Sequence, residues 1–229
     1  GTIASNQALT LDADTFTNNG GKLFAQQSGL VLTTTHALNN IKGEISSAQD
    51  LSLSSGDLDN TEGQIASEKK LQVQSSALNN QSGVIYAQDQ IKVAATGQVN
   101  NTFGTIVSKQ VDLASQSLLN DFGEIRAEDG TLNLAINGDV SNQSGEIFAT
   151  KEISLNSQQL NNQQGKIQNL SNINLAIQRV NNQSGLIYTQ GALQLKAQSN
   201  VDNQQGTIAA SQDILLQSTD LNNHQGIIQ

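Results

Sequence analysis

The sequence predicts an all-β protein, a parallel β-helix of about 11 coils with about 20 residues and three short strands per coil. Three observations predict it. A glycine recurs at intervals of 19 to 22 residues, an asparagine stands three positions before every such glycine but the first, and short segments between them alternate apolar and polar residues. Self-similarity at a fixed period of this length is typical of solenoid architectures.

The glycine and its neighbours define one corner of each repeat. An aliphatic residue follows each glycine by two positions, as Ile45 follows Gly43. The recurring glycines are Gly1, Gly21, Gly43, Gly63, Gly83, Gly104, Gly123, Gly145, Gly165, Gly185, Gly206 and Gly226. The recurring asparagines are Asn18, Asn40, Asn60, Asn80, Asn101, Asn120, Asn142, Asn162, Asn182, Asn203 and Asn223.

The apolar segments have the spacing of strands. Leu51 and Leu53, and likewise Leu71 and Val73, are two positions apart, which is the period of a strand with one buried face and not the 3.6-residue period of a helix. Strands this short have no partner within their own repeat. Each is therefore expected to pair in parallel with its copy one repeat later, and eleven coils would form a rod of about 50 Å.

Glycine and asparagine are expected to have separate structural roles at the corner. Glycine permits a positive φ or a close approach to the neighbouring coil. The asparagine fits either a left-handed turn conformation or an interior ladder of amides, and the sequence leaves both readings open. The absence of proline is consistent with strands that need every N–H for the neighbouring coils.

The repeat runs through the whole chain without a break. Residues 1–229 are therefore expected to form a single β-helical repeat domain. Both ends are in phase with the repeat and carry no cap, a feature that solenoids use against edge association. The chain is accordingly expected to be an internal fragment of a longer fibrous protein.

Composition argues against several functional classes. The chain has 11 Lys+Arg against 20 Asp+Glu, a net charge of −9, which is unfavourable for binding nucleic acid or an anionic membrane surface. No apolar run is long enough to insert into a bilayer. Without cysteine, and with His36 and His224 far apart and beside no Ser/Asp constellation, no catalytic residue, metal or cofactor is expected.

Residues 78–87, Leu-Asn-Asn-Gln-Ser-Gly-Val-Ile-Tyr-Ala, closed by Ile91 and Val93, resemble the filamentous haemagglutinin repeat. This repeat occurs in bacterial two-partner-secretion exoproteins, including adhesins and the toxin-delivery proteins of contact-dependent growth inhibition. The resemblance implies a right-handed β-helix, the hand that parallel crossovers generally take. It also implies export through an outer-membrane transporter and display on the bacterial cell surface.

The function expected from this reading is mechanical. A stiff stalk would support cell adhesion or carry a toxin to a neighbouring cell, with each coil adding about 4.8 Å of reach. A carbohydrate-active enzyme is a weaker alternative, based on Glu124 and Glu146 one coil apart, at about the 5 Å spacing of a retaining glycosidase pair. Asp121 and Arg126 lie nearby. A solvated acidic face is the preferred interpretation of this cluster, and a bridging calcium ion is another.

A second alternative is that the segment itself binds a receptor or a glycan on a target cell. Phe24, Tyr86, Phe148 and Tyr188 each stand three positions after a glycine, where alternation points a side chain outward. Rings that seal adjacent coils would be a structural explanation. Aromatic and Arg side chains are also common interface anchors. The candidate contact residues are Tyr86, Phe103, Val107, Phe122, Arg126, Phe148 and Tyr188.

Overall fold

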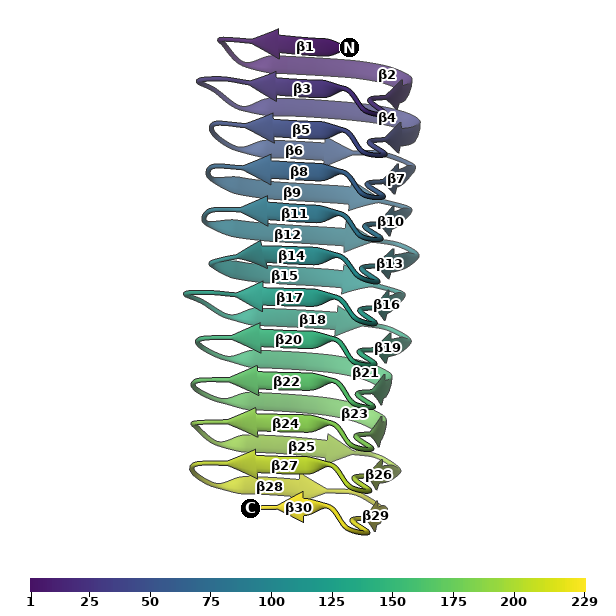
Figure 1. The fold of residues 1–229 in the computed structure, drawn as a ribbon, viewed down its shortest axis with the longest axis vertical. Coiled ribbons are helices and arrows are strands. Elements are labelled where there is room, and N and C mark those ends of the chain that lie inside the picture. The colour runs from purple at the N-terminus through teal and green to yellow at the C-terminus, as the bar shows by residue number, and fades with distance from the viewer.

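The computed structural model describes residues 1–229, and the chain winds into a straight stack of coils with its two termini at opposite ends (Figure 1). In Figure 1 the chain runs leftward along the front strands, passes to the back and returns rightward while it descends, so the coil is right-handed. The predicted parallel β-helix is confirmed. No helix in the structure is long and apolar enough to cross a bilayer.

One strand of every coil belongs to a twelve-stranded parallel sheet, here called the first sheet. Its register is continuous, since Ile45 is paired with Leu23 on one side and with Ile65 on the other. Its strands are β1 (Thr2–Ser5), β3 (Lys22–Ala25), β5 (Glu44–Ser47), β8 (Gln64–Ser67), β11 (Val84–Ala87), β14 (Thr105–Ser108), β17 (Glu124–Ala127), β20 (Glu146–Ala149), β22 (Lys166–Asn169), β24 (Leu186–Thr189), β27 (Thr207–Ala210) and β30 (Ile227–Ile228).

The remaining strands form an eighteen-stranded second sheet that bends around the other two sides of the coil. Seven coils contribute two strands each, namely β6 (Leu51–Ser54) and β7 (Asp57–Asp59), β9 (Lys70–Ser75) and β10 (Ala77–Asn79), β12 (Gln90–Ala95) and β13 (Gln98–Asn100), β15 (Gln110–Ser115) and β16 (Ser117–Leu119), β18 (Leu132–Ile136) and β19 (Asp139–Ser141), β25 (Leu193–Ala197) and β26 (Asn200–Asp202), and β28 (Ile214–Gln217) and β29 (Asp220–Asn222).

The prediction of three strands per coil is wrong for four coils. There the second and third strands are one continuous strand, in β2 (Leu9–Thr17), β4 (Leu30–Asn39), β21 (Ile153–Asn161) and β23 (Ile173–Asn181). None of these four contains a glycine, whereas three of the broken corners contain Gly56, Gly97 or Gly138. Glycine weakens a strand and favours a sharp bend, so its absence is consistent with a strand that continues through the corner. Between β2 and β4 the pairing register shifts at this corner, between Ala13 and Thr15.

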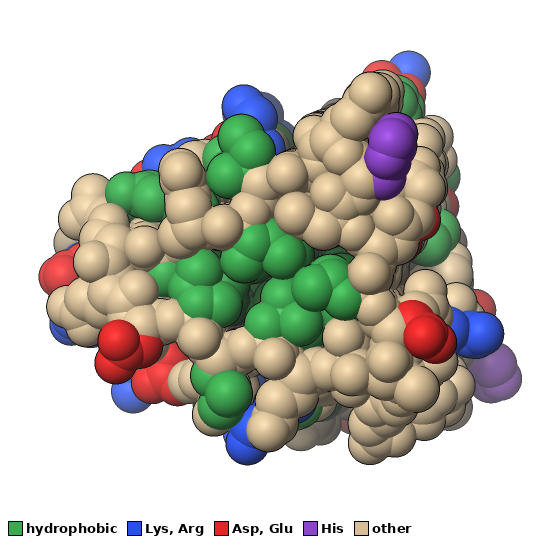
Figure 2. Space-filling view, turned by 90° about the horizontal axis from the view of Figure 1, so that it is seen from below, with side chains coloured by type: hydrophobic (Ala, Val, Ile, Leu, Met, Phe, Trp, Pro, Cys, Tyr) green, Lys and Arg blue, Asp and Glu red, His purple; other side chains and the backbone are tan.

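The core is a column of aliphatic side chains along the fibre axis. In one coil Ile45, Leu53 and Leu58 point inward from the three sides and are almost completely buried. Figure 2 looks onto the last coil and shows hydrophobic side chains gathered in the middle of the cross-section with charged side chains around the rim. The short period of alternation in the sequence thus produces one continuous hydrophobic core.

The repeated asparagines form the interior ladder. Asn18 Nδ2 donates to Asn40 Oδ1 at 2.8 Å, and Asn40 Nδ2 donates to Asn60 Oδ1 at 2.7 Å. The pattern continues from coil to coil as far as Asn223. Of the two readings left open by the sequence, the structure selects the amide ladder and excludes the left-handed conformation for these residues.

The left-handed residue is the one directly before each glycine. In the turn from Asn40 to Gly43, the glycine N–H donates to Asn40 O at 3.0 Å, and Lys42 has a φ of 54°. A positive φ at the third position is characteristic of a type II turn. The glycine itself is required by close approach, because a Cβ on Gly43 would lie 2.5 Å from Asn40 Oδ1 and would collide with Asn18 O.

Candidate functional site

The outward side chains of the first sheet form a ladder here called the outer row. Parallel pairing places Tyr86 beside Val107, Val107 beside Arg126, and Arg126 beside Phe148. Along the fibre the outer row consists of Ala4, Phe24, Ser46, Ala66, Tyr86, Val107, Arg126, Phe148, Gln168, Tyr188 and Ala209. The prediction that these aromatic side chains point outward is confirmed, and Tyr86 is 41% exposed.

Arg126 is the centre of a small ion-pair cluster. Its Nη1 lies 3.1 Å from Glu124 Oε1 and 2.9 Å from Glu146 Oε1. Its guanidinium carbon lies 4.6 Å from the ring centroid of Phe148, a cation–π contact with the next residue of the outer row. The arginine is therefore held by partners on its own coil and on the next coil.

This cluster bears on the enzymatic alternative. Glu124 and Glu146 are register partners, as the sequence predicts, but one guanidinium nitrogen binds both carboxylates. Asp121 faces elsewhere and accepts hydrogen bonds from Ser141 Oγ at 2.6 Å and from the Gln143 N–H at 2.9 Å. The arginine thus occupies the space that a glycosidic oxygen or a nucleophilic water would need. No group of three or more metal-ligating side chains occurs in the structure.

Two phenylalanines form a second feature at the corner, beside the outer row. Phe103 and Phe122 occupy the left-handed position of consecutive coils, with φ values of 56° and 55°. Their rings are stacked, with centroids 5.0 Å apart and an interplanar angle of 10°. The stacking anticipated from the sequence is confirmed. We call these two residues the corner pair.

The seven candidate contact residues lie in two separate rows. Tyr86, Val107, Arg126 and Phe148 are contiguous in the outer row, whereas the corner pair lies on a parallel row before the glycines. Tyr188 is separated from Phe148 by Gln168. Whether any of these residues contacts a ligand remains a prediction.

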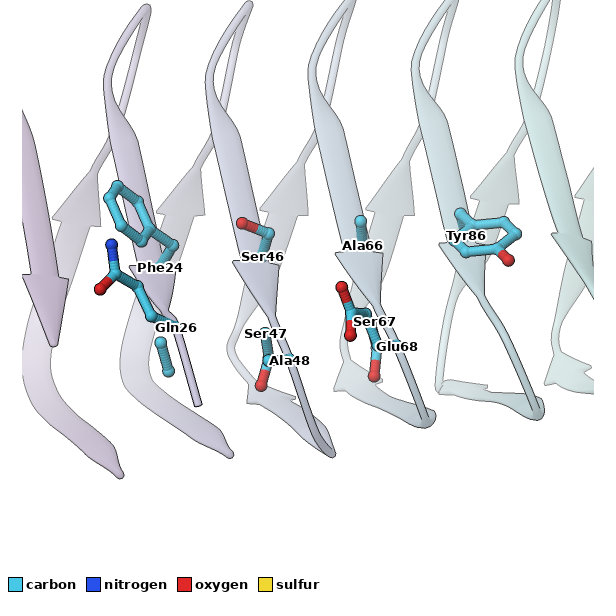
Figure 3. A pocket seen from close by; sticks show the side chains of 10 residues that line it. Phe24, Gln26, Ser46, Ser47, Ala48, Ala66, Ser67, Glu68 and Tyr86 are labelled. Atoms are coloured by element: carbon cyan, nitrogen blue, oxygen red, sulfur yellow. The ribbon is translucent and has the colours of Figure 1, made fainter. Parts of the chain in front are cut away.

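A shallow notch in the outer row was not predicted from the sequence. It lies between the rings of Phe24 and Tyr86, where small side chains of Ser46 and Ala66 leave space, and it has a volume of about 340 Å³ (Figure 3). Glu68 borders it from the turn that follows β8. The signal that could have found it is the run of two small residues between two aromatic ones at the same repeat position.

The charged side chains on the surface pair mainly between coils. Lys109 Nζ lies 3.0 Å from Asp89 Oδ1, and this hydrogen bond holds the pKa of Asp89 below, and that of Lys109 above, its ordinary value. His36 is exposed, and its Nδ1 lies 2.5 Å from Asp14 Oδ1 on the preceding coil. The continuous strands β2 and β4 bring these two exposed residues together on adjacent coils.

Comparison with known families covers the full length of the repeat. The family described as Haemagglutinin repeat matches residues 1–67, 43–144, 127–204 and 176–229, overlapping segments that together span the chain. The searches of curated proteins and of solved structures found no significant match to this chain. The family match and the unbroken parallel register lead to one assignment. The chain belongs to the haemagglutinin repeat family.

Proposed function

We propose that this chain is a stiff length of fibre in a secreted, surface-displayed bacterial exoprotein, and that it holds an adhesive or toxin-bearing tip away from the producing cell. Membership of the haemagglutinin repeat family points to a structural or adhesive role rather than to catalysis. The ion-pair cluster, in which one arginine binds both carboxylates, agrees with this role.

The observation that carries the proposal is the unbroken register along the fibre. Every strand of the first sheet pairs with its copy in the next coil, and the amide ladder runs through the interior of the same coils. Bending the fibre would stretch backbone and side-chain hydrogen bonds on one side of several coils at once. A rod in which each coil extends the length by about 4.8 Å is therefore suited to set a distance.

The fold is also compatible with export in an extended state. Each coil contacts mainly its immediate neighbours, so coils can stack one after another as the chain emerges. There is no cysteine and hence no disulfide that must form before assembly. We propose an outer-membrane transporter as the partner during export. Loss of the fibre from the surface of cells that lack the transporter is the expected result.

A change of length tests the stalk function. Residues 43–82 make up two whole coils, and deleting them joins Lys42 to Gly83 in phase with the repeat. In the full-length exoprotein, this deletion should shorten the fibre by about 10 Å, and five extra copies should lengthen it by about 48 Å. Cryo-electron tomography measures the fibre, and cell adhesion or target-cell killing measures the tip.

The removed segment contains none of the seven candidate contact residues, although several of its side chains border the notch. We therefore expect the deletion to leave tip activity intact. A fibre whose length does not follow the number of coils would refute the stalk function. A folded deletion variant that is exported but inactive would also refute it, because these coils would then act as more than a spacer.

A further inference from the structure

The corner pair is unusual for the position that it occupies. Phe103 and Phe122 have a positive φ, which is unfavourable for bulky side chains, and yet they are 58% and 55% exposed. The other non-glycine residues at this position are Lys42, Glu62, Ser82, Ser144, Gln164, Ser184, Gln205 and Gln225. Neither the turn nor the core requires an aromatic side chain here.

The stacked geometry leaves aromatic surface available. Each ring uses one face for its partner at a centroid distance of 5.0 Å, and the opposite face points away from the pair. The next residue at this position is the small Ser144, whose N–H donates to Gln163 O in the following coil. Because the serine side chain is short, it leaves a space beside the free face of the Phe122 ring.

This space is an open hollow of about 340 Å³, within the size range of small-ligand sites. The corner pair, Ser144 and Gln164 form one side. The strand residues Thr105, Glu124, Glu146 and Lys166 form the other side, and the floor is backbone at Gly104, Gly123 and Gly145. At each of these glycines a Cβ would collide with the asparagines of the interior ladder, so the position accepts no side chain.

The charges around the hollow are balanced, and its two carboxylates are held in place. Arg126 binds Glu124 and Glu146 and rests against Phe148, so both carboxylates have defined positions. Lys166 is the register partner of Glu146 and forms no ion pair. Two carboxylates and two cations give this region no net charge, while the chain as a whole carries −9.

We propose that this hollow binds a neutral glycan, with one sugar ring against the free face of Phe122. An uncharged sugar combines an apolar face of C–H groups with hydroxyls that both donate and accept hydrogen bonds. The Phe122 ring can pack against the C–H face, and the carboxylate oxygens, Gln164 and Lys166 can hydrogen-bond to the hydroxyls. The negative field of the fibre disfavours sulfated or sialylated glycans. A hollow of about 340 Å³ has the size of a small-ligand site, whereas a stable protein interface covers roughly 800 Å² on each partner.

Such a site goes beyond the stalk function, and it can be tested without the rest of the exoprotein's activity. The probes are β-1,4-linked glucose and N-acetylglucosamine oligosaccharides and lactose, with sialyllactose as the anionic comparison. Binding to the intact protein is followed by NMR line broadening of the sugar and by calorimetry. We expect saturable binding of at least one neutral probe and none of sialyllactose.

Four variants make the test specific. Phe122→Leu should weaken binding about 3- to 10-fold through the loss of ring contact, and Phe122→Tyr should retain it. Ser144→Gln fills the hollow with a longer side chain and should abolish binding. The turn tolerates glutamine, because Gln164 occupies the same turn position in the next coil. Ser184→Gln is the matched control, made at the same position two coils farther on, and should have no effect.

Several results would overturn the proposal. They are the absence of binding by all neutral probes, preferential binding of sialyllactose, and Phe122→Leu and Ser144→Gln variants that bind the neutral probe as tightly as the unchanged protein does. Recognition of a protein alone would overturn it as well. Circular dichroism of each variant confirms that the coil is intact. None of these results affects the stalk function, which depends on fibre length.

Discussion

Replacing Asn120 with alanine tests the interior ladder at the centre of the fibre. Asn120 is fully buried, its Nδ2 donates to Asn142 Oδ1 at 2.7 Å, and its Oδ1 accepts from Asn101 Nδ2 at 2.7 Å. The same amide nitrogen also lies 3.3 Å from Gly123 O and 3.2 Å from Glu146 O. Alanine removes all four contacts.

The expected loss follows from the groups that become unsatisfied. In the variant, Asn142 Oδ1 no longer accepts a hydrogen bond from residue 120 and remains buried without another donor. A buried unsatisfied acceptor costs about 1–3 kcal/mol. The other lost hydrogen bonds add about 1 kcal/mol each where no other partner takes their place. Asn120→Ala should therefore lower the free energy of unfolding by about 3–5 kcal/mol.

Urea unfolding followed by circular dichroism is the appropriate assay, with unchanged m-values as the condition for comparison. Asn223→Ala is the matched control, because its amide is the last rung, is half-buried, and donates only to Gly226 O. It should cost about 1 kcal/mol. If the two variants are equally stable, or if Asn120→Ala costs less than about 1 kcal/mol, the buried amide ladder does not stabilise the fold.

Three further predictions concern the corner and the surface. Gly123→Ala should destabilise by about 2 kcal/mol or more, because its Cβ would lie 2.7 Å from Asn120 Oδ1. Gly20→Ala, with open space but a φ of 61°, should cost about 1 kcal/mol; equal losses in thermal unfolding would contradict this reasoning. Gln205→Gly relieves a φ of 56° and should raise the free energy of unfolding by up to about 1 kcal/mol, whereas a lower value would show that the turn favours the side chain. Lys109→Met should raise the pKa of Asp89 toward 3.8 in an NMR titration, and an unchanged value would exclude the ion pair in solution.

The directions of the pKa shifts of Asp89 and Lys109 determine how their ion pair contributes to stability at different pH values. The pKa of Asp89 is lowered in the folded protein, chiefly by the hydrogen bond from Lys109. Its small contribution to stability is therefore complete above the ordinary value of 3.8 and is lost as the pH falls through the lowered pKa. The raised pKa of Lys109 acts in the opposite sense, with a contribution that is lost in alkaline solution. Both groups are exposed, so solvent screening keeps the two effects small.

Much of the candidate site could be predicted from the repeat position alone. Alternation placed Tyr86 and Phe148 outside, and the equal spacing of Glu124 and Glu146 from their glycines made them neighbours. The hollow and the notch could not be predicted, because each depends on which side chains from three or four coils stand next to one another. The role of Arg126 had the same origin, since its side chain spans two coils.

The sequence by itself determined the architecture, because a strict repeat has few ways to bury its apolar columns and to pair its backbone. It therefore predicted the parallel coils, their number and the columns of Ile and Leu. Only the tertiary structure decided that asparagine points inward, that Lys42 and its equivalents take the left-handed conformation, and that glycine serves a close approach. These choices depend on contacts with the coils before and after, which the local sequence of one repeat does not contain.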